Sequence, residues 1–306
     1  MTPSAASDAR ALTPPRGLRD LHIRNLFIIP TLALLILFNV FPLLWSLVLS
    51  FSEYRATGST APQAVGLANF RELLSRPDIH GYFIFTARFT VLAVAIEAAL
   101  GFSLALLLNR TLPGKGLIVT LLLLPMMMSP AIMAKFWAYI LDPNFGVLAW
   151  GFRALGLKPI LWFSDQTSAL WALVLVDVWQ WTPFVMLISL AGLGAIPKHL
   201  YEAAQIDRAS RWFVFTRITV PLVAPLVMMA LIFRTMDAFK IFDLIVLTEG
   251  GPFDQTVSVS WHLKRLALTQ SETGIGSALG YMVLVLVIGL ANLYLKYLDR
   301  IQGKTA

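Results

Sequence analysis

The chain has 306 residues, of which 58% are hydrophobic and only 13% are charged, and its mean hydropathy is +0.73. Soluble domains carry about 25% charged residues, so a water-soluble globular protein is excluded. The net charge of +7 comes from few charges and indicates an asymmetry between loops, not a nucleic-acid surface. The absence of cysteine excludes disulfide frameworks, thiolate nucleophiles and cysteine-based metal sites.

The first 25 residues form a polar leader that contains Pro3, Pro14 and Pro15 among Ala, Ser and Arg. This leader offers too little apolar surface to fold alone, so a disordered tail is predicted over 1–25. The apolar stretch that follows is longer than the hydrophobic region of a cleavable signal peptide. We therefore expect it to be retained as a membrane anchor.

Six apolar windows are long enough to cross a bilayer, whose core of about 30 Å needs roughly 20 helical residues. The windows are 26–51, 84–108, 117–141, 169–192, 219–247 and 277–298. The sequence therefore predicts an all-α integral membrane protein whose six-span domain, 26–298, is followed by a tail, 299–306. In the first outer loop, the spacing of Asn69 and Glu72 predicts a capping box that opens a short helix.

Basic residues predict the orientation of these spans, because cytoplasmic loops carry an excess of Lys and Arg. With both termini inside, the cytoplasmic segments hold thirteen such residues: Arg10, Arg16, Arg19, Arg24, Arg110, Lys115, Lys198, Arg208, Arg211, Arg217, Lys296, Arg300 and Lys304. The outer loops hold seven: Arg55, Arg71, Arg76, Arg153, Lys158, Lys264 and Arg265. Both tails are therefore predicted to be cytoplasmic.

Polar side chains inside the apolar windows are the candidates for a solute path, because a charge in hydrocarbon costs about 2.5 to 3.5 kcal/mol. The predicted topology places most of them at the middle or in the outer half of the membrane. The candidates are Asn39, Ser129, Lys135, Asp177, Gln180, Trp181, Arg234, Asp237 and Lys240. Glu97 lies near the bilayer centre, where a hydrogen bond between helices is the favoured interpretation.

Two interpretations of the charges in the fifth window remain open. Arg234, Asp237 and Lys240 are three residues apart, so they form either a structural ion network along one helix stripe or a surface that contacts solute. The rings of Trp179, Trp181 and Phe184, with polar groups between them, suit a sugar or a polyol, and an interfacial aromatic belt is the alternative. The three intramembrane cations, Lys135 among them, would also suit an anionic sugar derivative.

The third window contains Pro125 and Pro130, which free backbone carbonyls at membrane depth. Such carbonyls are tolerated only beside protein or a cavity, which favours a pore-lining segment.

No catalytic or metal site is indicated. Gly114-Lys115-Gly116 lacks the first glycine and the Ser or Thr of a P-loop. The four histidines lie on separate loops or the tail without metal-ligand spacing. No nucleophile and base converge as an intramembrane enzyme would require, so a non-catalytic protein without a cofactor of its own is predicted.

The predicted cytoplasmic loop 197–217 begins with a short amphipathic helix, in which Leu200, Ala203 and Ala204 share a face. A second segment follows with Trp212, Phe213 and Phe215. On its residues alone, this loop either lies on the lipid surface or docks into the groove of a partner.

The loop also resembles the EAA loop of permease subunits of binding-protein-dependent ABC importers, Glu-Ala-Ala, three residues, Gly, nine residues and Ile-x-Leu-Pro. The matching residues are Glu202, Ala203, Ala204, Arg208 and the run Ile218-Thr219-Val220-Pro221. Arg208 replaces the glycine of the pattern and Val220 replaces its leucine. A residue other than glycine disfavours a turn with positive φ, so Arg208 is expected to be helical or to face the partner.

The resemblance extends from about residue 26 to 298, and it is to the carbohydrate-uptake branch. Its further segments are 66–74, 106–110, 142–146, 179–183, 237–243 and 248–252, in the same order as in that branch. Those around Asp237 and the Gly-Gly-Pro turn are more similar to the F-type partner of a maltose transporter than to the G-type partner.

The resemblance implies a type I ABC importer fold in a bacterial inner membrane. It also implies four kinds of contact: a second homologous permease, two ATPases that bind ATP and Mg, an extracytoplasmic solute-binding protein, and membrane lipid.

By the same resemblance, the loop contacts an ATPase through Glu202, Ala203, Ala204, Asp207, Arg208 and Arg211. Trp212 and Phe215 are expected to pack the loop onto the helix bundle.

An ion-coupled secondary transporter is the alternative to an ABC permease. That class usually shows internal repeats, and the two three-span halves show no convincing repeat.

Overall fold

The computed structural model describes residues 20–58, 61–248 and 256–302, so the Gly-Gly-Pro turn at 250–252 and the tail residues 1–19 lie outside the described residues. The chain divides into two units, Met1–Val48 and Leu49–Ala306, and each is described by itself. In the first unit, α1 (Asp20–Leu35) continues through a π-helical turn, η1 (Ile36–Val40), into α2 (Phe41–Ser50). The helix thus begins within the predicted tail 1–25.

The second unit contains two short strands and a set of helices. In chain order these are β1 (Ser52–Glu53), β2 (Gln63–Ala64), α3 (Ala68–Ser75), α4 (Pro77–Leu108), α5 (Lys115–Leu123), η2 (Pro125–Met127), α6 (Pro130–Leu141), α7 (Val147–Ala154), α8 (Gln166–Gly194), α9 (Lys198–Ile206), α10 (Arg211–Val214), η3 (Phe215–Thr219), α11 (Val220–Phe239), η4 (Asp243–Leu247), α12 (Val259–Lys264), η6 (Arg265–Thr269) and α13 (Thr273–Gln302). The strands pair antiparallel, with Ser52 opposite Ala64.

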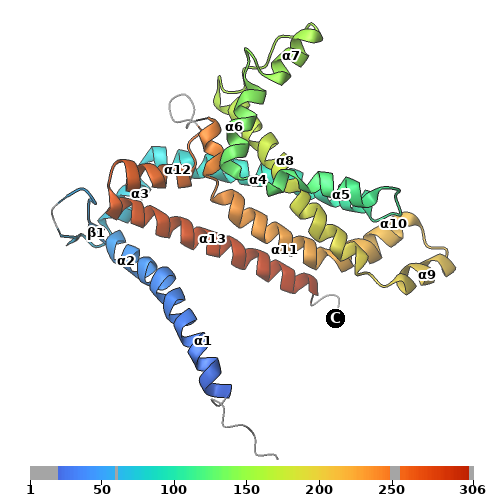
Figure 1. Cartoon of the computed structure of the whole chain (residues 1–306), viewed down its shortest axis with the longest axis horizontal. Helices are drawn as coiled ribbons and strands as arrows, with labels where there is room; N and C mark the ends of the chain where they lie inside the picture. The colour runs from blue at the N-terminus through green and yellow to red at the C-terminus, as the bar shows by residue number, and fades with distance from the viewer. Residues whose placement is uncertain (1–19, 59–60, 249–255, 303–306) are drawn as a thin grey trace, which may run out of the picture. The chain divides into compact units, whose positions relative to one another are not determined.

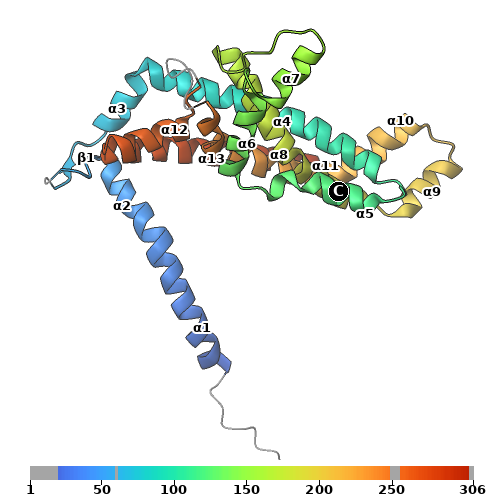
Figure 2. The ribbon, with the colours of Figure 1, turned by 45° about the horizontal axis from the view of Figure 1, so that its top comes forward.

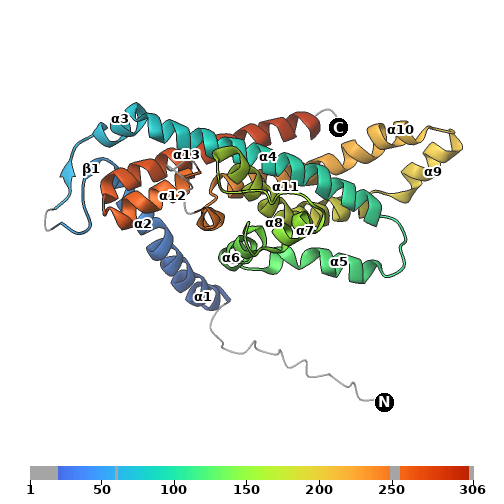
Figure 3. The ribbon, with the colours of Figure 1, turned by 90° about the horizontal axis from the view of Figure 1, so that it is seen from above.

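The second unit is built around α4, α8, α11 and α13 (Figures 1 and 2). Strand β1 and α3 lie at one end of this unit, whereas α9 and α10 lie at the opposite end (Figure 3). A topology that places the first outer loop and the loop 197–217 on opposite sides of a membrane requires this separation.

Five helices among the described residues are long and apolar enough to cross a membrane. They are Asn25–Ser50, Pro77–Leu108, Gln166–Gly194, Arg211–Phe239 and Thr273–Arg300. The remaining predicted span, 117–141, is not one helix: α5 ends at Leu123, a 3-10 turn starts at Pro125, and α6 starts at Pro130. Proline lacks a backbone N–H and clashes with the preceding turn, which explains both interruptions.

The fifth span differs from its prediction at both ends. Residues 211–217 are not a separate loop segment, because the helix runs from Arg211 through the π-helical turn η3 into α11. The helix ends at Phe239, ahead of the predicted end at 247, and a 3-10 turn covers Asp243–Leu247.

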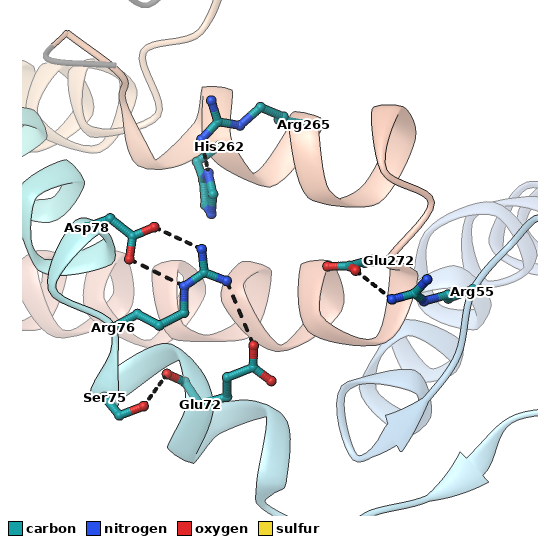
Figure 4. Close-up of polar contacts among 8 residues, drawn as sticks. All are labelled: Arg55, Glu72, Ser75, Arg76, Asp78, His262, Arg265 and Glu272. Carbon is teal, nitrogen blue, oxygen red and sulfur yellow. Dashed lines mark hydrogen bonds and ion pairs between the residues drawn. The ribbon is translucent and has the colours of Figure 1, made fainter. Parts of the chain in front are cut away.

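Polar contacts join the segments around α3, the start of α4 and the start of α13. Arg76 lies 2.9 Å from the carboxylate of Asp78 and 3.8 Å from that of Glu72, and Arg55 pairs with Glu272 just before α13 (Figure 4). The predicted capping box is wrong, although the short helix α3 does form. Asn69 lies inside α3 and is buried, and its amide donates to the backbone carbonyls of two residues at the end of α2 and in β1, 3.0 and 2.9 Å away.

Helix α8 begins at a side-chain cap. The carboxylate of Asp165 accepts hydrogen bonds from the backbone N–H groups of Thr167 and Ser168, at 2.9 and 3.1 Å. The Ser168 hydroxyl also donates to this carboxylate, and this bond is the main reason that the pKa of Asp165 lies below its ordinary value. The cap satisfies N–H groups that a helix start otherwise leaves without partners.

Helices α4 and α8 approach each other closely at Gly101. A Cβ atom at this position would lie 2.8 Å from Cβ of Val185 and 2.9 Å from the backbone N of Met186. Since the neighbouring atoms include backbone, a larger residue cannot be accommodated by a change of rotamer. Small residues permit this kind of close helix contact inside a membrane.

We predict that Gly101→Leu lowers the free energy of unfolding by roughly 1 to 3 kcal/mol, because the side chain forces α4 away from α8. The matched control is Gly81→Leu in the same helix, where a Cβ atom meets no other atom within 4 Å. Denaturant unfolding of the purified protein measures both variants. Equal stability of the two variants would contradict the packing described here.

Candidate functional site

The centre of the site is a buried guanidinium group that joins three helices. Arg234 on α11 donates from Nε and Nη2 to the two carboxylate oxygens of Glu97 on α4, at 2.7 and 2.8 Å. Its Nη2 also donates to Asp177 on α8 at 2.7 Å, and its Nη1 donates to Asp237 at 2.9 Å. Only 2% of the Arg234 side chain is exposed, and Glu97 is fully buried.

These distances and the burial of Arg234 and Glu97 describe a charged network in the interior of the second unit. The cost of burying an ion is offset only when good geometry and hydrogen bonds satisfy its partners, and the bidentate pair of Arg234 with Glu97 meets this condition. The structural ion network and the interhelical contact of Glu97 are therefore both present. The third charge of the predicted stripe, Lys240, makes no ion pair within the described part of the chain.

Two adjoining cavities, of about 130 and 520 Å³, lie beside this network and share three lining residues, Trp181, Asp237 and Lys240. Asp177 and Gln180 line the smaller cavity, whose wall the 3-10 turn after α11 completes. The Asp237 carboxylate is 58% exposed, so one end of the network faces the open space. Polar groups at membrane depth thus border a space that could admit a small solute.

The Trp181 ring is held by the network, because the Arg234 Cζ atom lies 5.0 Å from its centroid. Trp179 lies on the other side of α8, where its ring meets Trp137 edge-on at 5.4 Å. It lines a separate apolar cavity of about 770 Å³. Residues two apart in a helix point about 200° apart, so the predicted aromatic cluster is divided, and only Trp181 and Phe184 border the polar cavities.

The remaining candidate path residues lie elsewhere. Asn39 belongs to the first unit, where its amide donates to the Leu35 carbonyl at 3.0 Å. Ser129 and Lys135 are exposed on the segment around α6 and line neither polar cavity. Gln180 donates to the Met128 carbonyl at 3.2 Å. This bond gives a hydrogen-bond partner to a backbone carbonyl at the proline interruption, and a carbonyl inside a membrane requires such a partner.

The loop after α8 folds as two helices joined by a tight turn. The Tyr201 hydroxyl lies 3.1 Å from that of Thr219, and this contact ties α9 to the start of α11. Ala204 is buried, whereas Glu202 and Ala203 are exposed. The predicted packing of the aromatic pair is correct only in part, because Phe215 meets Phe102 of α4 at 6.4 Å while Trp212 remains 73% exposed.

Arg208 forms the turn itself, with φ of 50°. Its N–H donates to the Gln205 carbonyl at 3.1 Å, and the N–H of Ala209 donates to the Ala204 carbonyl at 2.9 Å. These two bonds define a Schellman motif with Arg208 at the left-handed position, where glycine is usual. The expectation of a helical Arg208 is therefore wrong, and the residue bears a strain of about 1 to 2 kcal/mol.

Comparison with known proteins identifies the fold and the family. Residues 97–302 match the family described as binding-protein-dependent transport system inner membrane component. The chain belongs to this family. It is therefore a membrane translocation subunit, called the permease below, and the resemblance to binding-protein-dependent permeases is confirmed.

Relatives extend the match over nearly the whole permease. The trehalose/maltose transport system permease protein MalF of Thermococcus litoralis is 37% identical over 286 residues, covering 93% of this chain and 96% of its own. The trehalose transport system permease protein SugA of Mycobacterium tuberculosis is 32% identical, covering 97% and 95%. These relatives support a transport permease and not the alternative of an ion-coupled secondary transporter.

A solved structure supports the same fold. A chain of a bacterial alginate ABC transporter, crystallised in complex with an alginate pentasaccharide-bound periplasmic protein, matches with a TM-score of 0.79 at 21% identity, covering 91% of the permease and 94% of that chain. The predicted fold class of an all-α ABC permease is thus confirmed.

Sequence reasoning did not find the partner of Glu97. Arg234 is 137 positions away, and no local spacing links the two. The available signal was chemical: a carboxylate near the bilayer centre requires a cation at the same depth, and the fifth span supplies one.

We predict that Arg234→Met lowers the free energy of unfolding of the permease by roughly 3 to 5 kcal/mol, because it leaves Glu97 and Asp177 buried without a cation. The control is Lys240→Gln, at the exposed position that directly follows the last residue of α11, which should change stability by less than about 0.5 kcal/mol. Thermal or denaturant unfolding in detergent measures the difference. If the double variant Glu97→Gln, Arg234→Gln lost as much as its single variants combined, the two residues would not be coupled.

Proposed function

We propose that the permease is the transmembrane subunit of an ABC transporter that imports a sugar, a polyol or a sugar derivative across the cytoplasmic membrane of a bacterial cell. Family membership supports the importer, and the trehalose and maltose named for the relatives support the solute class. Within the chain, the observation that carries the proposal is the pair of adjoining cavities beside Arg234, which share Trp181, Asp237 and Lys240 in their walls.

The proposed complex contains a second, homologous permease, two ABC ATPase subunits and an extracytoplasmic solute-binding protein. ATP and Mg²⁺ bind to the ATPases, and the permease itself is not an enzyme, in keeping with its lack of a P-loop. The alginate transporter of similar fold was solved with a periplasmic protein bound, which supports the role of the binding protein. Both termini of the permease lie in the cytoplasm, as its distribution of Lys and Arg predicts.

The proposed solute path runs past Trp181, Asp237 and Lys240. The indole ring offers a flat apolar face, while the carboxylate and the ammonium group accept and donate hydrogen bonds to hydroxyl groups. Arg234 is already engaged by three carboxylates, so its charge is not available to an anion. This arrangement favours an uncharged polyhydroxylated solute over a phosphate or sulfonate derivative. Ser129 and Lys135 are proposed to extend the path beyond these cavities, and a role of Asn39 of the first unit in the path stays a prediction.

The loop 197–217 is the proposed coupling element, seated on one ATPase subunit. Glu202 acts as its polar anchor, and the exposed Ala203 permits close approach of the partner. Buried Ala204 and the Tyr201 contact hold α9 against the bundle. Closure of the ATPase dimer on ATP would then move the loop and, with it, the helix that begins at Arg211 and carries Arg234.

We predict that Glu202→Lys uncouples ATP hydrolysis from solute uptake. The reversed charge weakens the binding of the loop to the ATPase subunit. Uptake should therefore fall roughly tenfold or more, the equivalent of at least 1.4 kcal/mol. Membrane abundance of the permease and its unfolding temperature should not change, because Glu202 is exposed. Uptake and ATPase activity are measured on the same purified complex in proteoliposomes.

The matched control is Asp299→Lys, a reversal at an exposed position near the cytoplasmic end of α13, which should leave uptake unchanged. Normal transport by the Glu202→Lys variant would refute the assignment of this loop to the ATPase.

A further inference from the structure

A large apolar cavity lies against the face of α8 that carries Trp179. Its volume is about 770 Å³, and it is lined by side chains of α4, α5, α6 and α8. These helices belong to the second unit, where α4 and α5 both contact α8 (Figure 3). None of the described residues that line this cavity also lines the two cavities beside Arg234. It is therefore separate from the proposed solute path.

The cavity extends along α8 and opens at the surface of the second unit. Its lining positions on α8 run from Trp171 to Met186, a rise of about 22 Å along the helix. Trp171 is 46% exposed and Leu121 on α5 is 56% exposed, so the rim is accessible from outside the chain. One leaflet contributes about half of a bilayer core of about 30 Å. The cavity is therefore long enough for a lipid acyl chain.

The described residues that line this cavity carry no charge. An empty space of this volume would deprive the wall of dispersion contacts, and an ion inside it would be desolvated without a partner. Because the family is one of inner membrane components, hydrocarbon surrounds these helices and can enter through the exposed rim. The wall therefore favours an occupant with an apolar chain.

One polar group in the wall requires an acceptor from outside its own helix. Nε1 of Trp137 and the hydroxyl oxygen of Thr182 are buried, and neither has a hydrogen-bond partner among the described residues. The Thr182 hydroxyl can reach a carbonyl three or four residues earlier in α8 after a change of rotamer. The indole N–H of Trp137 can only donate, and its ring is held edge-on against Trp179 at 5.4 Å. A buried indole N–H usually has an acceptor, so the occupant must carry an uncharged one.

A glycerolipid meets these requirements better than a helix of another subunit. The backbone carbonyls of a membrane-spanning helix are bonded within that helix, so such a helix would offer the Trp137 N–H no backbone acceptor. The ester carbonyls of a glycerolipid lie next to its acyl chains and have no donor of their own. Trp162 and Trp171 line the same cavity near the start of α8, and indole rings are enriched at the level of lipid headgroups.

We propose that this cavity binds one acyl chain of a membrane glycerolipid. The chain lies along α8 towards Met186, and an ester carbonyl of the lipid accepts a hydrogen bond from the indole N–H of Trp137. The headgroup remains outside the cavity, on the side of Trp171. This lipid site goes beyond the proposed function, since it requires membership of the membrane family and not a particular solute.

Native mass spectrometry of the purified and delipidated transport complex tests the proposal. The probe is phosphatidylethanolamine, and its diether analogue, which keeps the chains and the headgroup but has no ester carbonyl, is the matched ligand. One molecule of the ester lipid should bind the wild type about three- to tenfold more tightly than the analogue does, the range expected for one hydrogen bond. Trp137→Phe keeps a ring but loses the N–H, so this variant should bind both lipids with the lower affinity.

Further variants locate the site. Thr182→Val should leave the affinity for the ester lipid unchanged, because this hydroxyl is not the donor. Leu175→Trp fills the cavity at its partly exposed rim and should lower the affinity for both lipids roughly tenfold or more. The matched control is Val91→Trp, at an exposed position of α4 that does not line the cavity, and it should bind as the wild type does.

Equal binding of the two lipids by the wild type, or wild-type affinity of the Trp137→Phe variant, would overturn the proposal. If the assembled complex showed no lipid binding that Leu175→Trp removes, a segment of another subunit would occupy the cavity and the proposal would be wrong. Neither result concerns solute uptake or ATP hydrolysis, so the proposed function would stand in both cases.

Discussion

Inside the apolar layer of the second unit, a guanidinium group cannot remain without carboxylate partners, because the desolvation of a single buried ion costs several kcal/mol. Arg234 meets this requirement by joining Glu97 of α4 and Asp177 of α8 to its own helix, α11. The three helices are thereby fixed in register with one another. Trp181 and Asp237 contact the same guanidinium group. The network therefore fixes the positions of two side chains that line both of the adjoining cavities.

The same helices reach the proposed coupling loop. One continuous helix of 29 residues runs from Arg211 to Phe239, a length of about 43 Å, and it carries the loop aromatics at one end and Arg234 towards the other. Phe215 contacts Phe102 of α4, so two of the three helices joined by the network also meet the loop. A movement imposed on the loop would therefore be transmitted to the cavity walls through rigid elements, without a separate signalling path.

The sequence predicts the helical membrane fold and the family well, because apolar length and the EAA pattern are local signals. One of its two interpretations of the fifth window, an ion network along one helix stripe, includes the pairing of Arg234 with Asp237, which are three residues apart. The pairing of Arg234 with Glu97 depends on how distant helices pack, which no local pattern contains. Two errors have identifiable causes: helical periodicity separates Trp179 from Trp181, and a backbone hydrogen-bond motif imposes positive φ on Arg208 even though its side chain disfavours it.

The central claim is that solute crosses beside this ion network at the expense of ATP hydrolysed on other subunits. Proteoliposomes that contain the complete complex, with the binding protein outside and radiolabelled sugar as solute, test it directly. Uptake should require ATP on the ATPase side and the binding protein on the other, and it should continue when a protonophore collapses the ion gradient. Uptake that persisted without ATP and was abolished by the protonophore would contradict it.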